Sequence, residues 1–354
     1  MHPAYFAMSM ATGIVSVACH LVGFAPVAAA LFWLNGLVYA ALWVLTLARI
    51  ARYPAAFRAD LLSHGRGVGF FTTVAATCVL GTQALVIGGW PGLAFGLWVA
   101  GIALWAGLTY GIFAALTVSR SKPPLSVGLH GGWLVSVVAA QSVAVLGAQL
   151  AGGGHARAEP TLFFALVMWL GGGMLYLWII GLIFYRYTFF EMRPSDMSPP
   201  YWINMGAVAI STLAGTMIIA AADRSPLVRD LLPFVKGLTL AFWATATWWI
   251  PMLVILGVWR HVYRRFPLRY DPLYWGAVFP LGMYTACTYR LAQVFEVDFL
   301  RPVPGVFVFL ATAAWLAAFV GWAHAVVSWA LGRGRRRNIP AAVSQATPGD
   351  EPMS

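Results

Sequence analysis

The sequence predicts an all-α polytopic membrane protein with ten transmembrane helices. Of its 354 residues, 61% are hydrophobic and only 9% are charged. This composition is typical of a chain embedded in lipid and excludes a soluble domain of this length. Two patterns support the prediction: apolar runs of about 20 residues recur along the chain, and basic residues gather in every second connection between them.

The apolar runs predict where the spanning helices lie. A helix rises about 1.5 Å per residue, so about 20 residues cross a hydrocarbon core about 30 Å thick. The predicted helices cover residues 6–22, 27–48, 68–88, 92–117, 129–150, 161–185, 201–222, 234–259, 273–294 and 303–331. We therefore expect one ten-helix transmembrane domain in 1–332, followed in 333–354 by a basic juxtamembrane segment and a disordered tail.

The basic residues predict the orientation of the helices. Four connections and a tail cluster together hold sixteen of the 22 lysines and arginines. By the positive-inside rule that side faces the cytoplasm, and an even number of helices places both termini there. We expect an integral protein of the cytoplasmic (inner) membrane, whose tail arginines contact anionic lipids. These are Arg333, Arg335, Arg336 and Arg337. The net charge of +11 then needs no nucleic acid partner.

Tryptophan and small polar residues divide the helices into two sets. Thirteen of the seventeen tryptophans fall in even-numbered helices, whereas Ser, Thr, Asn and Gln favour odd-numbered ones. Large aromatic rings suit lipid contact and the interfacial belt, while small and hydroxyl-bearing residues suit close helix contact or a wet lumen. The pattern predicts five helical hairpins, with odd helices in an inner ring around a pore and even helices outside. Tight packing of the odd helices without a pore explains the same pattern.

Cysteine and histidine patterns predict no cofactor, no metal site and no enzymatic activity. Cys19, Cys78 and Cys287 all lie inside apolar runs, without the spacing of a disulfide framework or a metal site. A membrane haem or metal redox protein is the alternative class, and it needs two or more histidines at one depth on facing helices. His130 and His324 fall toward the cytoplasmic side, but no helix carries two histidines at ligand spacing.

The ninth helix carries the most unusual local pattern, because Phe279 precedes Pro280 inside an apolar run. Proline in a helix interior costs about 3 kcal/mol unless the local break is used. At helical spacing the face of Phe279 continues through Gly282 or Met283 to Ala286 and Arg290. These residues are mostly small, as a lumen requires. From spacing alone, Phe279 is either a pore gate with Pro280 or an aromatic ring packed between helices.

Arg290 is a candidate for a pore mouth. It lies eleven residues after Phe279, so an undisturbed helix returns it to nearly the same face about 16 Å further out. A cation there raises the local anion concentration. The alternatives are an arginine that reaches the headgroups or one that pairs with Glu296 or Asp298.

Small and polar residues of the odd helices are candidates for the pore lining. Their hydroxyl and amide groups can donate hydrogen bonds to a partly dehydrated anion, but each hydroxyl can equally bond to the carbonyl four residues back in its own helix. The candidates are Thr12, Ser16, Thr73, Thr77, Ser136, Asn204, Ser211, Thr212, Gly282 and Ala286.

Five motifs in the odd helices carry a family resemblance. They read "YFAMSMATGIVS", "TTVAATCVLGTQ", "GGWLVSVVAAQ", "PPYWINMGAVAISTLAG" and "WGAVFPLGMYT". Together they resemble the tellurite-resistance/dicarboxylate transporter family, which includes plant slow-type anion channels, fungal malate permeases and fungal sulfite exporters. The resemblance covers about residues 5 to 331. One departure lies near Ser136, where the family often has a proline.

The resemblance implies a homotrimer in which each protomer has its own pore, lined by the five odd helices and blocked by Phe279. It implies a small inorganic or organic anion as the substrate: sulfite, tellurite, chloride, nitrate or a dicarboxylate. A pore without fixed charges binds weakly and releases quickly, which favours passive or potential-driven transport, in the direction of efflux. A proton-coupled dicarboxylate carrier is the main alternative.

Overall fold

The computed structural model describes residues 2–331, and every regular element in that range is helical. The long helices are α1 (Phe6–Val22), α2 (Ala25–Arg52), α4 (Phe71–Val86), α5 (Pro91–Val118), α7 (Val135–Gly152), α8 (Ala158–Phe189), α9 (Ile203–Ala220), α11 (Leu232–Val258), α12 (Trp275–Val294) and α13 (Pro302–Ala330). Short helices α3 (Pro54–Leu61), α6 (Leu125–Gly128) and α10 (Pro226–Asp230) lie in the connections. The long helices agree in order and position with the ten predicted ranges.

Nine helices in the described range are long and apolar enough to cross a membrane. The remaining long helix, α12, is less apolar because residues such as Thr285, Thr288 and Arg290 interrupt its apolar side chains. It packs against α1, α9 and α13, so other helices rather than lipid surround most of it. The fold is therefore that of an all-α polytopic membrane protein.

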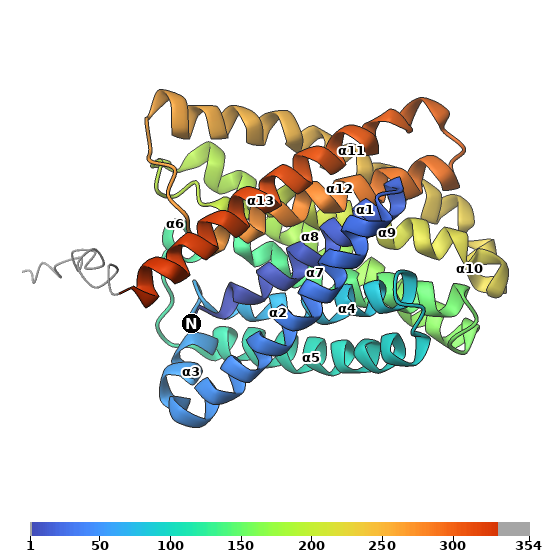
Figure 1. Cartoon of the computed structure of the whole chain (residues 1–354), viewed down its shortest axis with the longest axis horizontal. Helices are drawn as coiled ribbons and strands as arrows, with labels where there is room; N and C mark the ends of the chain where they lie inside the picture. Colours follow the sequence, from blue (N-terminus) through green and yellow to red (C-terminus); the bar gives the residue numbers. More distant parts are fainter. Residues whose placement is uncertain (1, 332–354) are drawn as a thin grey trace, which may run out of the picture.

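The long helices form two concentric rings. Helices α1, α4, α7, α9 and α12 each contact the next in this order, and α12 contacts α1, which closes an inner ring. Helices α2, α5, α8, α11 and α13 each pair with one of them in a hairpin. In Figure 1 all these helices run across the picture, with α5 along the lower edge of the bundle.

Burial confirms the predicted inner and outer sets. In the apolar windows of α1, α4, α7 and α9, 78% to 94% of the residues are buried. The corresponding share is only 17% to 44% in α2, α5, α8, α11 and α13. Since apolar side chains cover the outer helices, their exposed faces suit lipid rather than water.

The tryptophans of the outer helices divide between two roles. Trp33, Trp178, Trp248 and Trp329 are more than half exposed on the outer surface, as predicted for lipid contact. Trp98, Trp169 and Trp315 are instead buried, and each indole N–H donates a hydrogen bond to an inner helix. For this second group the expectation of lipid contact is wrong, because an indole nitrogen is a donor that finds an acceptor when buried.

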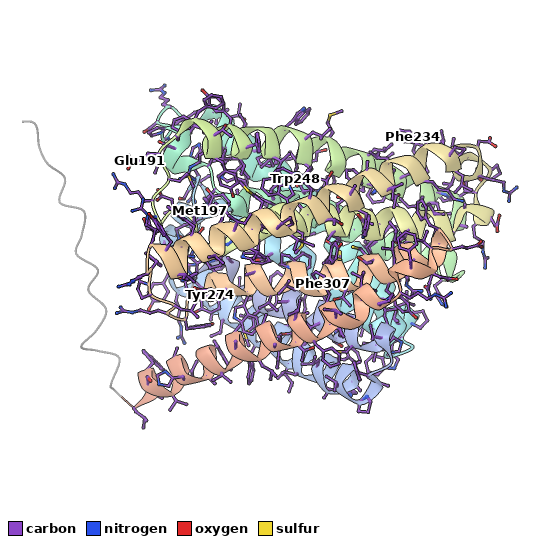
Figure 2. All side chains as sticks on the ribbon, turned by 90° about the horizontal axis from the view of Figure 1, so that it is seen from above. Glu191, Met197, Phe234, Trp248, Tyr274 and Phe307 are labelled. Atoms are coloured by element: carbon purple, nitrogen blue, oxygen red, sulfur yellow. The ribbon has the colours of Figure 1, made fainter. Side chains whose placement is uncertain are left out.

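All five inner helices begin at the same end of the bundle, each with a short 3₁₀ turn. These turns are η1 (Pro3–Tyr5), η2 (Gly67–Phe70), η3 (Gly131–Leu134), η4 (Pro199–Trp202) and η7 (Pro272–Tyr274). We call this the basic end, because the predicted basic connections lie there, and the opposite one the far end. Both ends of the described chain lie at the basic end (Figure 1), as do Glu191, Met197 and Tyr274, whereas Phe234 lies at the far end (Figure 2). The predicted tail, 333–354, falls outside the described residues.

Candidate functional site

Two cavities lie within the inner ring, one toward each end. The basic-end cavity has a volume of about 260 Å³ and is bordered by residues at the start of all five inner helices, including Met10, Thr72, Val135, Ile203 and Gly276. The far-end cavity is bordered by all five helices as well, including Ile14, Cys78, Ser142, Ile210 and Met283. Its volume of about 20 Å³ has room for one water molecule.

A closed layer separates the two cavities, and Phe279 lies in this layer. On α12 the basic-end cavity ends at Gly276 and the far-end cavity begins at Met283. The helical rise makes this interval about 10 Å long. Phe279 is 0% exposed and borders neither cavity, yet helical spacing places it on the same side of α12 as Gly276 and Met283.

No other aromatic ring of the inner helices lies at this depth. The segments between the two cavities are 11–13, 73–77, 136–141, 204–209 and 277–282, and Phe279 is the one aromatic residue among them. Most of the others are Ala, Gly, Val, Ser and Thr. The side chain of Phe279 is therefore a large group among mostly small ones in the closed layer between the two cavities.

Pro280 and Gly282 fix the rotation of α12 about its axis. Helix α12 continues through Pro280 without interruption. The proline ring packs on Gly206 of α9, where an added Cβ atom would lie only 2.7 Å from Pro280 Cγ. Gly282 packs on α1, since a Cβ atom there would lie 3.0 Å from Ile14 Cγ2. Met283, rather than Gly282, follows Phe279 on the cavity face.

The predicted hydroxyls of α1 and α4 form hydrogen bonds with outer helices or, for Thr73, within the same segment. Thr12 accepts a hydrogen bond from Trp315 of α13 at 2.9 Å, and Ser16 donates one to the carbonyl of Ala28 in α2 at 2.7 Å. Thr77 shares a hydrogen bond of 2.8 Å with Tyr39 of α2. Thr73 donates to the Phe70 carbonyl at 2.7 Å. None of these four threonines and serines borders either cavity within the ring.

The predicted polar residues of α7 and α9 are likewise used within the helices or toward α8. Ser136, Ser211 and Thr212 donate to carbonyls three or four residues earlier. Asn204 donates from Nδ2 to the Tyr187 hydroxyl of α8 at 3.1 Å. These four residues border neither cavity. Of the predicted lining set, the structure places Ala286 at the far-end cavity.

Arg290 borders the far-end cavity together with Ala286 and Met283. Its Nη1 donates to Gln293 Oε1 at 3.0 Å. Asp298, one of its two candidate partners, instead pairs with Arg301 at 2.7 Å. Glu296, the other candidate, forms no ion pair with Arg290 either, so Arg290 has no ion-pair partner in residues 2–331. It borders the cavity on the side of α12 that also holds Phe279.

Histidine side chains cap two of the five inner helix beginnings at the basic-end cavity. Nδ1 of His2 accepts from the Ala4 N–H, and Nδ1 of His130 accepts from the Gly132 N–H, both at 3.1 Å. Burial lowers the pKa of both histidines, and a nearby arginine lowers each further: Arg66 for His2 and Arg186 for His130. Both residues therefore favour the neutral form that can accept these bonds.

No group of three His, Cys, Asp or Glu side chains within residues 2–331 is placed to hold a metal ion. Cys19, Cys78 and Cys287 are buried free thiols.

One residue of the basic-end cavity, Arg186, was not predicted from the sequence. The sequence predicts Arg186 in a loop, because the apolar run ends at residue 185. In the structure α8 continues to Phe189, and Arg186 is buried. It is 6% exposed and borders the cavity. The downstream aromatic residues Tyr187, Phe189 and Phe190 are the signal in the sequence that the helix extends further.

Ten long helices in two rings, with apolar outer faces and a closed central axis, define a polytopic integral membrane protein with a candidate pathway through each chain. Residues 1–323 match the sequence profile of the voltage-dependent anion channel (SLAC1) family. The chain belongs to this family, whose members are channels and transporters, and the predicted resemblance is confirmed.

Relatives with curated sequences agree with this assignment. An uncharacterized membrane protein of Mycobacterium tuberculosis is 39% identical over 150 residues, which cover 42% of this chain and 76% of the relative. An uncharacterized transporter of Methanocaldococcus jannaschii is 27% identical over 83% of this chain and 84% of its own. A sulfite efflux pump of Arthroderma benhamiae is 24% identical over 90% of this chain and 88% of its own.

Proposed function

We propose that the protein conducts a small anion out of the cytoplasm through the inner ring, with Phe279 as the gate. Sulfite is the first candidate, because the chain is similar over most of its length to sulfite efflux pumps. Tellurite, chloride, nitrate and dicarboxylates are the further candidate substrates. The observation that carries the proposal is the position of Phe279 between two cavities in a chain of an anion channel family.

The direction of the inner helices supports selection for anions. A helix N-terminus carries about half a positive elementary charge, and five such ends surround the basic-end cavity. No carboxylate is among the described residues that border the far-end cavity, and Arg290 there supplies a full positive charge beside the partly negative C-terminal ends of the inner helices. Hydroxyl and backbone donors with partial charges bind an anion weakly enough to release it.

The membrane potential supplies the driving force in this proposal. The positive-inside rule assigns the basic end to the cytoplasm of the cell. A negative interior of 100 mV then expels a monovalent anion with about 2.3 kcal/mol. Efflux needs no other energy source.

The first experiment measures anion flux in proteoliposomes that contain the purified protein. We expect flux of sulfite that follows the membrane potential and is independent of an imposed proton gradient. Chloride, nitrate, tellurite and malate provide the selectivity series. Flux that requires the proton gradient supports the alternative of a proton-coupled carrier, and absence of flux for every anion contradicts the proposal.

The gate is tested by Phe279→Ala. Loss of the only aromatic ring in the closed layer should join the two cavities and raise sulfite flux several-fold. Removing a buried phenylalanine costs about 3–5 kcal/mol of stability, so Phe279→Leu, which retains more volume, is the second variant and should give an intermediate flux. A matched control is Phe309→Ala on α13, whose ring is 64% exposed on the outer surface. If folded Phe279→Ala protein conducts like the wild type, Phe279 is no gate.

We also propose the homotrimer that the family resemblance implies, with one pathway in each protomer. Light scattering in detergent should give a protein mass of about 115 kDa, three times the 38.3 kDa of one chain. A mass of one chain contradicts the trimer without affecting the proposed pathway.

A further inference from the structure

Arg186 is the one buried side chain among the described residues that belongs to Asp, Glu, Lys or Arg. Burying an arginine costs several kcal/mol unless a carboxylate or a set of hydrogen-bond acceptors compensates for the lost hydration. The hydrogen-bond partners and charges around Arg186 therefore indicate which ligand the guanidinium group binds.

The protein partners of Arg186 satisfy only part of its guanidinium group. Nη1 donates to the carbonyl of Leu129 and, at 2.7 Å, to the hydroxyl of Tyr201. Nε is buried and has no hydrogen-bond partner. No carboxylate of residues 2–331 forms an ion pair with Arg186. Two neutral acceptors do not cancel the charge, so the guanidinium group carries a positive charge that no direct partner neutralises.

Asp196 is the one acidic residue among those that border the basic-end cavity. Its Oδ2 atom accepts a hydrogen bond from the backbone N–H of Arg193 at 3.0 Å. The carboxylate is thus held within its own loop and forms no ion pair with Arg186.

The backbone around Arg186 is packed closely enough to hold the group in place. Gly131 at the start of η3 lies so near η4 that an added Cβ atom would be 2.5 Å from the Pro200 carbonyl oxygen. This contact brings Leu129 and Tyr201, the two partners of Nη1, to the same point. It also brings the positive ends of α7 and α9, with their leading turns, beside the guanidinium group.

From these observations we propose that Arg186 is the centre of an anion-binding site in the basic-end cavity, and that the site takes a small oxyanion before it reaches Phe279. An oxyanion in the cavity offers the negative charge that Arg186 lacks among its protein partners, and a guanidinium group binds such oxygens in a fork. The cavity volume of about 260 Å³ accommodates a small oxyanion with several water molecules. This inference rests on the proposed function for its role in transport, but not for binding itself.

The first test compares the half-saturating sulfite concentration at the two ends of the protein. In oriented proteoliposomes, Arg186→Gln should raise the half-saturating sulfite concentration at the basic end by about tenfold, the loss expected for one charge-assisted hydrogen bond. The half-saturating concentration at the far end should not change. Arg186→Lys, which keeps the charge, should lie between wild type and Arg186→Gln. Asp196→Asn, which removes a negative charge from the same cavity, should lower the basic-end value.

Arg193→Gln is the matched control. Arg193 is an exposed arginine of the neighbouring loop that does not border the cavity. Its loss removes one positive charge from the same end of the protein and should leave both half-saturating concentrations unchanged. If folded Arg186→Gln behaves like Arg193→Gln, the proposal is overturned. An equal rise at both ends overturns it as well, because it indicates a purely structural effect on the pathway.

A second measurement keeps Arg186 intact in case its variants do not fold. Ser195 borders the basic-end cavity, and the native cysteines are buried, so Ser195→Cys offers one reactive thiol for maleimide labelling. Nitrate, which does not react with maleimide, should slow the labelling in a saturable manner relative to gluconate at equal ionic strength. Absence of protection overturns the site. Protection without any anion flux retains the site and contradicts the proposed function alone.

Discussion

Phe279 and Arg290 show how far helical spacing alone can place residues on one face of a helix. Both were predicted to share a face of α12, and the structure places that face toward the ring axis, with Arg290 at the far-end cavity. The hydroxyls of α1, α4 and α9 behave differently, because spacing along one helix cannot tell which neighbour a face will meet. Thr12 meets a tryptophan of α13 rather than the axis, and no pattern within α1 records the position of that tryptophan.

Arg290→Gln tests the charge at the far end. Loss of a cation beside a narrow cavity should lower anion flux from that end several-fold, and the effect should shrink as salt is added, because salt screens the field of the charge. The control is Arg301→Gln at the same end, an arginine already paired with Asp298 at 2.7 Å. Equal flux in both variants over a range of salt concentrations would remove Arg290 from the pathway.

The capping histidine His130 predicts a loss of stability in acid. An unfolded histidine has a pKa of about 6.5, and burial lowers the pKa of His130 in the folded protein. Above about pH 6.5 both states are neutral and the stabilisation is complete; as the pH falls below this value the unfolded state takes up its proton first, so stability decreases. The melting temperature should therefore fall between about pH 7 and pH 5.

The same experiment on His130→Asn supplies the control. Asparagine can cap Gly132 but does not titrate, so its melting temperature should depend less on pH over this range. Identical pH dependence in the two proteins assigns the acid sensitivity to another group, of which His2 is the next candidate.

Helices as units were predicted more accurately than the contacts between them. Because the lipid core fixes the length of an apolar run, all ten ranges could be placed from composition alone. The division into inner and outer helices was also accessible, since small and polar residues mark the inner set. The end of α8 was not, because Arg186 interrupts the apolar run while its helix continues, and the buried position of that arginine depends on Leu129 and Tyr201 from other segments.

Gly206 governs how closely α9 approaches α12. In Gly206→Ala the new Cβ atom would meet Pro280 Cγ at 2.7 Å, and a proline ring cannot rotate away. The helices must separate, which should cost about 1–3 kcal/mol and lower the melting temperature. Since Phe279 precedes Pro280, the separation should also raise the basal sulfite flux. In the control Gly237→Ala on α11 no atom lies within 4 Å of the added Cβ, so both quantities should stay near wild type.

The orientation of the whole bundle can be tested with single cysteines, because all three native thiols are buried. Ser121→Cys is exposed at the basic end, and Asp223→Cys replaces a side chain that is 99% exposed at the far end. A membrane-impermeant maleimide should label Asp223→Cys on intact cells, and Ser121→Cys only after permeabilisation. The reverse pattern would place the basic end outside and reverse the proposed direction of efflux.

The shared direction of the five inner helices has a consequence for how the pathway can open. Many carriers contain two repeats of opposite orientation, which exchange conformations so that one site faces each side of the membrane in turn. Here every hairpin starts at the same end, and five hairpins in a closed ring cannot be divided into an inverted pair. Such an exchange of halves is not available to this architecture. In the proposed function, opening is therefore a local motion, the rotation of the Phe279 side chain within a ring of helices that keeps its arrangement.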